Sequence, residues 1–237
     1  MRYLWCALLI FLIAGRLVNA DDNDPNDPNE SADVKTEPAA NDPNDPNELL
    51  WTKWDAVVKD PNDPNELLRA NWDAIVSVLQ NKDFDQKTKE KIVGKIVSPF
   101  FDFPLIAKLA LWRKHWPKFT QPQREKFTRL FAERLKASYL DKISLYTDEK
   151  AFIKPAVREG KVISIPMELI SKDKKIAIIY KIRKADKRWK IYDMEIQGVS
   201  VLLTYRAQFD DILRRDTVEE LLSRLQKQIN RRTEPEL

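Results

Sequence analysis

The sequence predicts an α+β domain in which several helices come first, an antiparallel meander follows, and two further helices end the chain. Three observations lead to this prediction. Apolar residues recur at helical spacing as far as Leu140, the period changes to two between Ala151 and Ile196, and helical spacing returns after Gly198. This order of elements is typical of a sheet whose one face is covered by helices.

The chain of 237 residues opens with the pattern of a secretory signal. Arg2 precedes an apolar run from Leu4 to Ala14, and Val18-Asn19-Ala20 offers small residues where a signal peptidase cleaves. The run is shorter than a transmembrane helix needs. We therefore expect residues 1–20 to be a signal peptide cleaved after Ala20 and the mature protein to be soluble and exported, with an uncleaved anchor as the alternative.

Residues 21–64 form an acidic lead that contains a repeat of 18 residues. The run Asp24–Glu30 recurs as Asp42–Glu48 and as Asp60–Glu66, and Asp21–Glu66 carries fourteen acidic and three basic residues, a net charge of −11. The repeated prolines block helix continuation, so we expect most of this lead to be disordered. Its carboxylates suit a hard cation such as calcium, but the placing of the prolines and the lack of a glycine favour a flexible linker.

The remainder of the chain, from Leu67 on, is basic, with 36 basic and 23 acidic residues and a net charge of +13. Such a domain could bind anionic lipid headgroups, an acidic protein or nucleic acid, or could simply have a solvated basic face. The export signal argues against nucleic acid. The only cysteine is Cys6, inside the predicted signal peptide, which excludes a disulfide framework, a thiol nucleophile and a cysteine metal site in the mature chain.

The domain itself is expected to span residues 65–230, with a flexible tail at 231–237. Thr120 and Gln123 form a capping box that opens a strongly periodic helix, with Phe127, Leu130, Phe131, Leu135 and Tyr139 on one face. The other predicted helices are Asn65–Gln80, Asp85–Val97, Pro104–His115, a helix starting at Val199, and Thr217–Ile229.

Four strands are predicted where the apolar period is two: Ala151–Val157, Val162–Ser171, Lys175–Lys184 and Arg188–Ile196. The short polar turns between them predict an antiparallel meander. We expect two rows of side chains to face the helices, namely Ile163, Ile165, Met167 and Leu169, and Ile176, Ile178, Tyr180 and Ile182.

Catalytic groups are scarce in this sequence. His115 is the single histidine, and we interpret it as solvated or capping because nothing marks a triad partner or a phosphate loop. Asp193 and Glu195 share one face of the last strand. If that face were inside, one of them could act as a general base of an isomerase or hydratase; if it were outside, they would be surface charges, which is the interpretation we prefer.

Two runs resemble a known family. They are WKIYDMEIQGVSVLLTYRAQF from Trp189 to Phe209, and DFPLIAKLALWRKHWPKFTQPQREKFTRLF from Asp102 to Phe131. Both are similar to the signatures of the MlaC family, periplasmic phospholipid shuttles also known as toluene-tolerance or ABC transporter auxiliary components. The resemblance covers roughly Glu66 to Ile229. Trp112 stands where the resemblance leads us to expect a glycine, and the acidic lead has no counterpart in the family.

The resemblance implies an α+β fold with helices packed on one face of a curved antiparallel meander sheet, an NTF2-like cone with an apolar cavity. It implies a non-enzymatic, monomeric periplasmic carrier that binds phospholipid as cargo and needs no cofactor, metal or nucleic acid. Its partners would be an inner-membrane ABC lipid transporter complex and an outer-membrane lipoprotein complex. The alternative function is a cone-fold isomerase or hydratase-like enzyme acting on a small hydrophobic substrate.

The predicted lipid-binding residues are the apolar and aromatic side chains that could line this cavity. Their helical and strand periods alone favour ordinary core packing, and the resemblance favours the cavity. Arg206 would either fix the strand-to-helix geometry or anchor a headgroup phosphate. The full prediction comprises Phe100, Phe103, Leu109, Trp116, Phe127, Leu130, Phe131, Leu135, Tyr139, Ile165, Met167, Ile178, Tyr180, Tyr192, Met194, Val199, Leu202, Tyr205 and Arg206.

Overall fold

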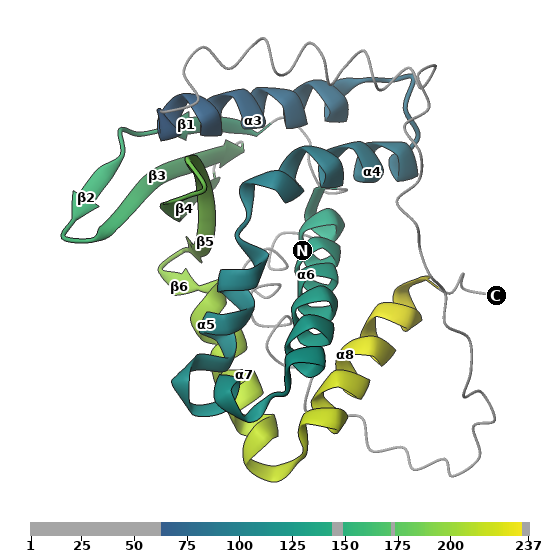
Figure 1. Cartoon of the computed structure of the whole chain (residues 1–237). Coiled ribbons are helices and arrows are strands. Elements are labelled where there is room, and N and C mark those ends of the chain that lie inside the picture. The colour runs from purple at the N-terminus through teal and green to yellow at the C-terminus, as the bar shows by residue number, and fades with distance from the viewer. Residues whose placement is uncertain (1–62, 144–148, 172–173, 234–237) are drawn as a thin grey trace. The chain divides into compact units, whose positions relative to one another are not determined.

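The computed structural model describes residues 63–143, 149–171 and 174–233, all within one compact unit, Lys59–Leu237 (Figure 1). The predicted signal peptide, nearly all of the acidic lead and the last residues of the predicted tail lie outside the described residues. Within them the predicted α+β class is confirmed, because helices pack against a curved, open antiparallel sheet.

Most helices begin directly after a side chain that caps their first turn. The side chains of Asp63, Asp85 and Asp102 accept backbone N–H groups of the first turns that follow them. The predicted capping box is confirmed, since the Thr120 amide donates to Gln123 Oε1 at 2.8 Å and the Gln123 amide to Thr120 Oγ1 at 3.4 Å. The helices are α3 Pro64–Gln80, α4 Gln86–Val97, η1 Ser98–Phe100, α5 Phe103–His115, η2 Trp116–Lys118, α6 Gln121–Ile143, α7 Val201–Arg215 and α8 Val218–Thr233.

The described strands form one antiparallel sheet with the order β1-β3-β4-β5-β6, and β2 pairs with β3 next to β1. The predicted meander is therefore confirmed. Ile165, Met167 and Ile182, from the two rows expected to face the helices, are buried. The strands are β1 Lys150–Ile153, β2 Val157–Glu159, β3 Val162–Ser171, β4 Lys174–Ala185, β5 Arg188–Ile196 and β6 Val199–Ser200.

Two of the differences from the predicted boundaries have a clear structural cause. The strand expected over Ala151–Val157 is split into β1 and β2, because Pro155 has no amide hydrogen for the ladder with β3. The helix expected from Val199 begins at Val201, since Val199 and Ser200 first pair with the end of β5. The hairpin turn between β5 and β6 consists of Gln197 and Gly198, both at positive φ.

A β-bulge interrupts the pairing of β4 with β5. Lys181 lies opposite Asp193 and Ile182 opposite Ile191, so Tyr192 is the extra residue on β5. Beyond the bulge the alternation of side chains changes phase. This explains why apolar residues occur at both parities of β5, a pattern from which the sequence alone could not assign an inner and an outer face.

Two buried aspartates join the helices to the central strands. Asp102 donates its amide to the Ile191 carbonyl at 2.9 Å, and its carboxylate accepts Arg183 Nε at 2.7 Å. Asp193 accepts the Ser200 hydroxyl at 2.8 Å and the Leu202 amide at 3.1 Å. Asp102 therefore fixes the start of α5 on β5, and Asp193 fixes the start of α7.

The helical layer contains a closed aromatic core. Phe131 lies edge-on to Phe209 and Tyr205, with ring centroids 5.1 and 4.9 Å apart, and Phe127 lies 5.3 Å from Phe209. Leu221 and Leu225 of α8 are fully buried as well. The Tyr205 hydroxyl is buried without a hydrogen-bond partner among the described residues. Side chains fill this part of the domain completely enough to leave even a polar atom enclosed.

Trp112 breaks the helix predicted over Pro104–His115. Its φ of 55° and ψ of −175° lie in a region that essentially only glycine populates, so the chain kinks there, at a cost of about 1–3 kcal/mol. The side chain is exposed. The glycine that the family resemblance implies at this position would adopt the same backbone without strain.

The interpretation of His115 as solvated or capping is wrong. The imidazole is buried, and its Nε2 lies 2.7 Å from Asp210 Oδ1 of α7. Asp210 also binds Lys114 and Arg214, each at 2.5 Å. The hydrogen bonds from Lys114, His115 and Arg214 hold the pKa of Asp210 well below its usual range. This cluster ties the last turn of α5 to α7.

Replacing Asp193 with alanine should lower the free energy of unfolding by about 3 kcal/mol, because the Ser200 hydroxyl, the Leu202 amide and the Lys181 ammonium lose a buried acceptor. Urea denaturation measures this. Ser200→Ala removes the helix cap and one hydrogen bond to Asp193 but leaves the carboxylate its Leu202 and Lys181 donors, so this matched control should cost only about 1 kcal/mol. Equal losses in the two variants would contradict the role assigned to Asp193.

Replacing Asp210 with asparagine should cost about 1 kcal/mol at pH 7. The folded-state pKa of Asp210 lies below the unfolded value, so its stabilisation is present above about pH 4 and is lost as the pH falls through the folded-state pKa. Thermal melts of native protein and Asp210→Asn across this range should therefore converge in acid. A difference independent of pH would contradict the assignment.

Candidate functional site

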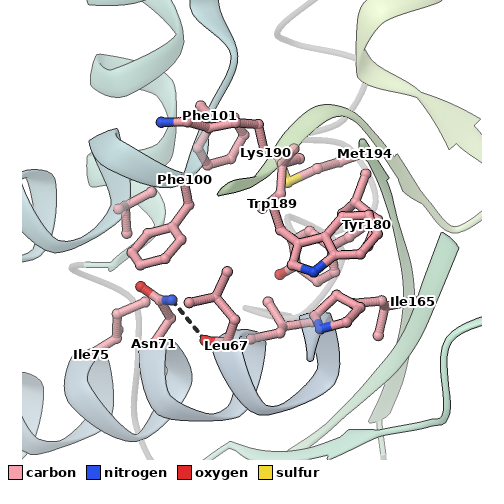
Figure 2. Close-up of a pocket in the computed structure, with 15 residues that line it drawn as sticks. Leu67, Asn71, Ile75, Phe100, Phe101, Ile165, Tyr180, Trp189, Lys190 and Met194 are labelled. Carbon is pink, nitrogen blue, oxygen red and sulfur yellow. Dashed lines mark hydrogen bonds between the residues drawn. The ribbon is translucent and has the colours of Figure 1, made fainter. Parts of the chain in front are cut away.

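An apolar pocket lies between helix α3 and the sheet, with η1 and the end of α4 closing one side (Figure 2). It encloses about 590 Å³ of space unoccupied by atoms, part of which is open solvent. The sequence predicts a cavity, and the structure has this partly open pocket. Its lining consists of Pro64, Leu67, Leu68, Asn71, Ile75, Val97, Phe100, Phe101, Ile165, Tyr180, Ile182, Trp189, Lys190, Ile191 and Met194.

Helix α3 forms one wall of the pocket and is attached to the sheet edge by polar contacts at its first turns. Asn65 Nδ2 donates to the Lys154 carbonyl at 2.6 Å, and Asn65 Oδ1 accepts the Ala156 amide at 2.9 Å. At the other end, Lys89 Nζ of α4 donates to the Leu79 carbonyl at 2.8 Å. These bonds hold the helix at both ends, and Leu67, Asn71 and Ile75 point from it into the pocket (Figure 2).

The facing wall comes from β3, β4 and β5, and the bulge at Tyr192 decides which residues of β5 belong to it. Tyr180 lies opposite Met194, and Ile182 lies opposite Ile191; all four line the pocket. Met194 and Ile191 are three positions apart, which in a regular strand would place them on opposite faces. The bulge brings both onto the pocket face and leaves Asp193 on the other one.

The polar groups of the pocket are few. Asn71 Nδ2 donates to the Leu67 carbonyl at 2.7 Å within α3, and Lys190 Nζ donates to the Pro99 carbonyl. Lys184 places its ammonium 5.1 Å from the ring centroid of Trp189. Apolar walls with one cation at the lining and another over Trp189 suit a ligand that has a long apolar part and a polar or anionic end.

Four of the predicted site residues line the pocket: Phe100, Ile165, Tyr180 and Met194. Five others lie in the closed helical core, namely Phe127, Leu130, Phe131, Leu202 and Tyr205. The structure thus divides the aromatic and apolar residues of the prediction between a packed core and an open pocket. A contact of either set with lipid stays a prediction.

The other predicted residues lie outside the pocket lining. Met167 is buried on the sheet, and Phe103 stacks on Phe101 with 5.7 Å between ring centroids. Val199 is exposed, and Arg206 Nε donates to the Leu109 carbonyl at 3.0 Å. Burial lowers the pKa of Arg206, although the negative charge of Asp193 acts to raise it. Leu109, Trp116, Leu135, Ile178 and Tyr192 are partly buried, and the side chain of Tyr139 lies outside the described residues.

The prediction of site residues did not include the α3 wall. Leu67, Asn71 and Ile75 recur every four residues, which is a helical face, and this spacing could have marked them. Ile182 already belonged to a strand row predicted to face inward. Val97, Phe101, Trp189, Lys190 and Ile191 join the site through the chain path of η1 and the bulge in β5, for which the sequence carries no periodic signal.

Asp193 and Glu195 do not reach the pocket. The preferred interpretation of both as surface charges is wrong for Asp193, which is only 6% exposed, and Glu195 pairs with Lys181. Burial acts to lower the pKa of Lys181, but its hydrogen bond to Glu195 and the charges of both carboxylates outweigh this and raise it. No Asp or Glu stands among the described residues that line the pocket, so the isomerase or hydratase alternative has no carboxylate base there.

The described residues also limit the class of site. No group of three or more His, Cys, Asp or Glu side chains in this part of the chain could hold a metal ion. No helix between residues 63 and 233, where the structure describes the chain, combines the length and apolar character of a membrane span.

The fold is similar to that of a solved structure. A phospholipid-binding protein from Ralstonia solanacearum, solved in complex with a phospholipid, superimposes with a TM-score of 0.64 and 20% sequence identity. The match covers 73% of this chain and 99% of that one. At this level of identity the likeness establishes a shared fold.

Sequence comparison points to one family. The chain is 30% identical over 111 residues to the intermembrane phospholipid transport system binding protein MlaC of Haemophilus influenzae, a match that covers 44% of this chain and about half, 52%, of that relative. The model of the family named MlaC protein matches residues 69–227, most of the described domain. The chain belongs to the MlaC family.

Proposed function

We propose that this protein is a phospholipid carrier that holds acyl chain in the pocket between α3 and the sheet. The observation that carries the proposal is the lining of that pocket, in which leucine, isoleucine, phenylalanine and methionine side chains surround space that no side chain fills. Each methylene buried there contributes about 0.8 kcal/mol, so part of one acyl chain already supplies substantial affinity. The family and the phospholipid-bound relative of the same fold support this assignment.

The charges near the pocket suit a phospholipid headgroup. Lys190 lies at the lining, and Lys184 stacks over Trp189. An ammonium group at or beside the lining attracts a phosphate without requiring a fixed geometry. The four sequence-predicted residues at the pocket, Phe100, Ile165, Tyr180 and Met194, are the proposed acyl-chain contacts.

The route of transport belongs to the same proposal. The carrier would act in the periplasm after removal of residues 1–20 and exchange phospholipid between an inner-membrane ABC transporter complex and an outer-membrane lipoprotein complex. The transport system named for the Haemophilus relative supports a role in intermembrane transport. The net charge of +13 from Leu67 onward would speed encounter with acidic docking sites or anionic headgroups.

Filling the pocket should remove the lipid. Leu68→Trp and Met194→Trp each place an indole in the space between α3 and β5, and native mass spectrometry of gently purified protein should show a loss of bound phospholipid of about tenfold. Phe152→Trp, at a side chain that is exposed on β1, is the matched control and should retain native occupancy.

Thermal denaturation shows whether each variant is folded, so that loss of lipid is not confused with loss of structure. Native protein that is purified under gentle conditions and carries no phospholipid would contradict the proposal. So would folded pocket variants with full lipid occupancy.

A further inference from the structure

The kink in α5 presents a tryptophan to solvent on a strained backbone. Trp112 combines a φ of 55° with a ψ of −175°, whereas Asp186, Lys187 and Gln197, the other described non-glycine residues at positive φ, lie in hairpin turns. The side chain remains 43% exposed. Neither the local backbone preference nor burial accounts for an indole at this position. A contact with an external partner would account for it.

The exposed indole is held in a fixed orientation by two arginines. The guanidinium of Arg206 on α7 lies 4.1 Å from the ring centroid of Trp112, and that of Arg113 lies 5.7 Å away. Arg206 is itself anchored, because its Nε donates to the Leu109 carbonyl at 3.0 Å. The indole is therefore preorganised on the surface by cation–π contacts.

An exposed leucine and exposed basic residues flank the contact between Trp112 and Arg206 along the two helices. Leu203, 52% exposed, lies one helical turn before Arg206 on α7. Arg113, Lys114 and Lys118 are exposed beside the kink. Asp210, the acid that pairs with Lys114, is also bound by His115 and Arg214. We call the surface of Trp112, Leu203, Arg113 and Arg206 the tryptophan platform.

We propose that the tryptophan platform docks the protein on an anionic bilayer surface, with the indole of Trp112 and the side chain of Leu203 entering the headgroup region. Tryptophan prefers the membrane–water interface, and each nearby cation adds attraction to anionic lipid. Exposed apolar side chains flanked by basic residues are complementary to such a surface. The inference rests on the proposed function, because a lipid carrier must meet membranes, and adds the part of its surface that does so.

Trp112 and Leu203 are absent from the pocket lining, which allows docking and lipid binding to be separated. Trp112→Gly removes the indole and relieves the backbone strain at once, so the variant should melt at the same or a higher temperature than native protein. Leu203→Ser removes the second apolar group from an exposed position. Val162→Ser, on an exposed valine of the β2–β3 hairpin, is the matched control.

Flotation with vesicles of phosphatidylcholine containing phosphatidylglycerol tests the proposal on the full mature chain. Native protein should float with these vesicles, less so in high salt and with phosphatidylcholine alone. Trp112→Gly and Leu203→Ser should each lower the bound fraction about tenfold, and Val162→Ser should leave it unchanged. Native protein that does not float overturns the proposal. Flotation unchanged by Trp112→Gly also overturns it, and would direct the search to an acidic protein partner.

Lipid extraction distinguishes the failure of this proposal from failure of the proposed function. Trp112→Gly should carry as much phospholipid as native protein, because its pocket lining is intact. If native protein floats, Trp112→Gly abolishes flotation and native protein carries no lipid, the result supports the tryptophan platform and contradicts the carrier function. If native protein and Trp112→Gly both carry lipid and neither floats, the result supports the carrier function and contradicts the tryptophan platform.

Discussion

The side chain of Asn65 is the contact on which the pocket depends. One amide group both donates to the Lys154 carbonyl and accepts the Ala156 amide, and so fixes the first turn of α3 on the connection between β1 and β2. Further along, α3 crosses the pocket instead of packing closely onto the strands, and Lys89 holds its far end. A helix held at its ends by polar bonds can border a space that its own side chains do not fill. In a closed core, contacts between apolar side chains would instead set the distance between helix and sheet.

The domain combines two kinds of packing. Around Phe131, Tyr205 and Phe209 the rings lie edge to face and enclose even an unpartnered hydroxyl, whereas between α3 and β3–β5 apolar side chains border open space. Asp102 and Asp193 join the two regions, because they fix the starts of α5 and α7 on β5. The packed helical core can therefore stabilise the fold while the pocket stays available for an apolar ligand. The strained backbone at Trp112 belongs to the helical region, and Trp112 does not line the pocket.

The positions of helices and strands could be predicted from the sequence, because local patterns encode them. The helical period and the Thr120–Gln123 box placed the helix starts to within a residue or two, and alternation placed the strands of the meander. The sequence could not predict which apolar stripe closes and which stays open, because both have the same period. The bulge at Tyr192 shifts the phase of β5 and has no sequence signature of its own, and the buried position of Asp193 depends on it. Burial of His115 depends on Asp210, far away along the chain. These features are set by tertiary contacts, which a pattern along one segment does not contain.

The central claim is that hydrocarbon occupies the space between α3 and the sheet. The most direct measurement is an electron density map of the protein purified under gentle conditions without delipidation. The account predicts continuous elongated density bordered by Leu68, Tyr180 and Met194, with its polar end toward Lys190. A map in which these side chains meet one another, or in which ordered water fills the space, would contradict it.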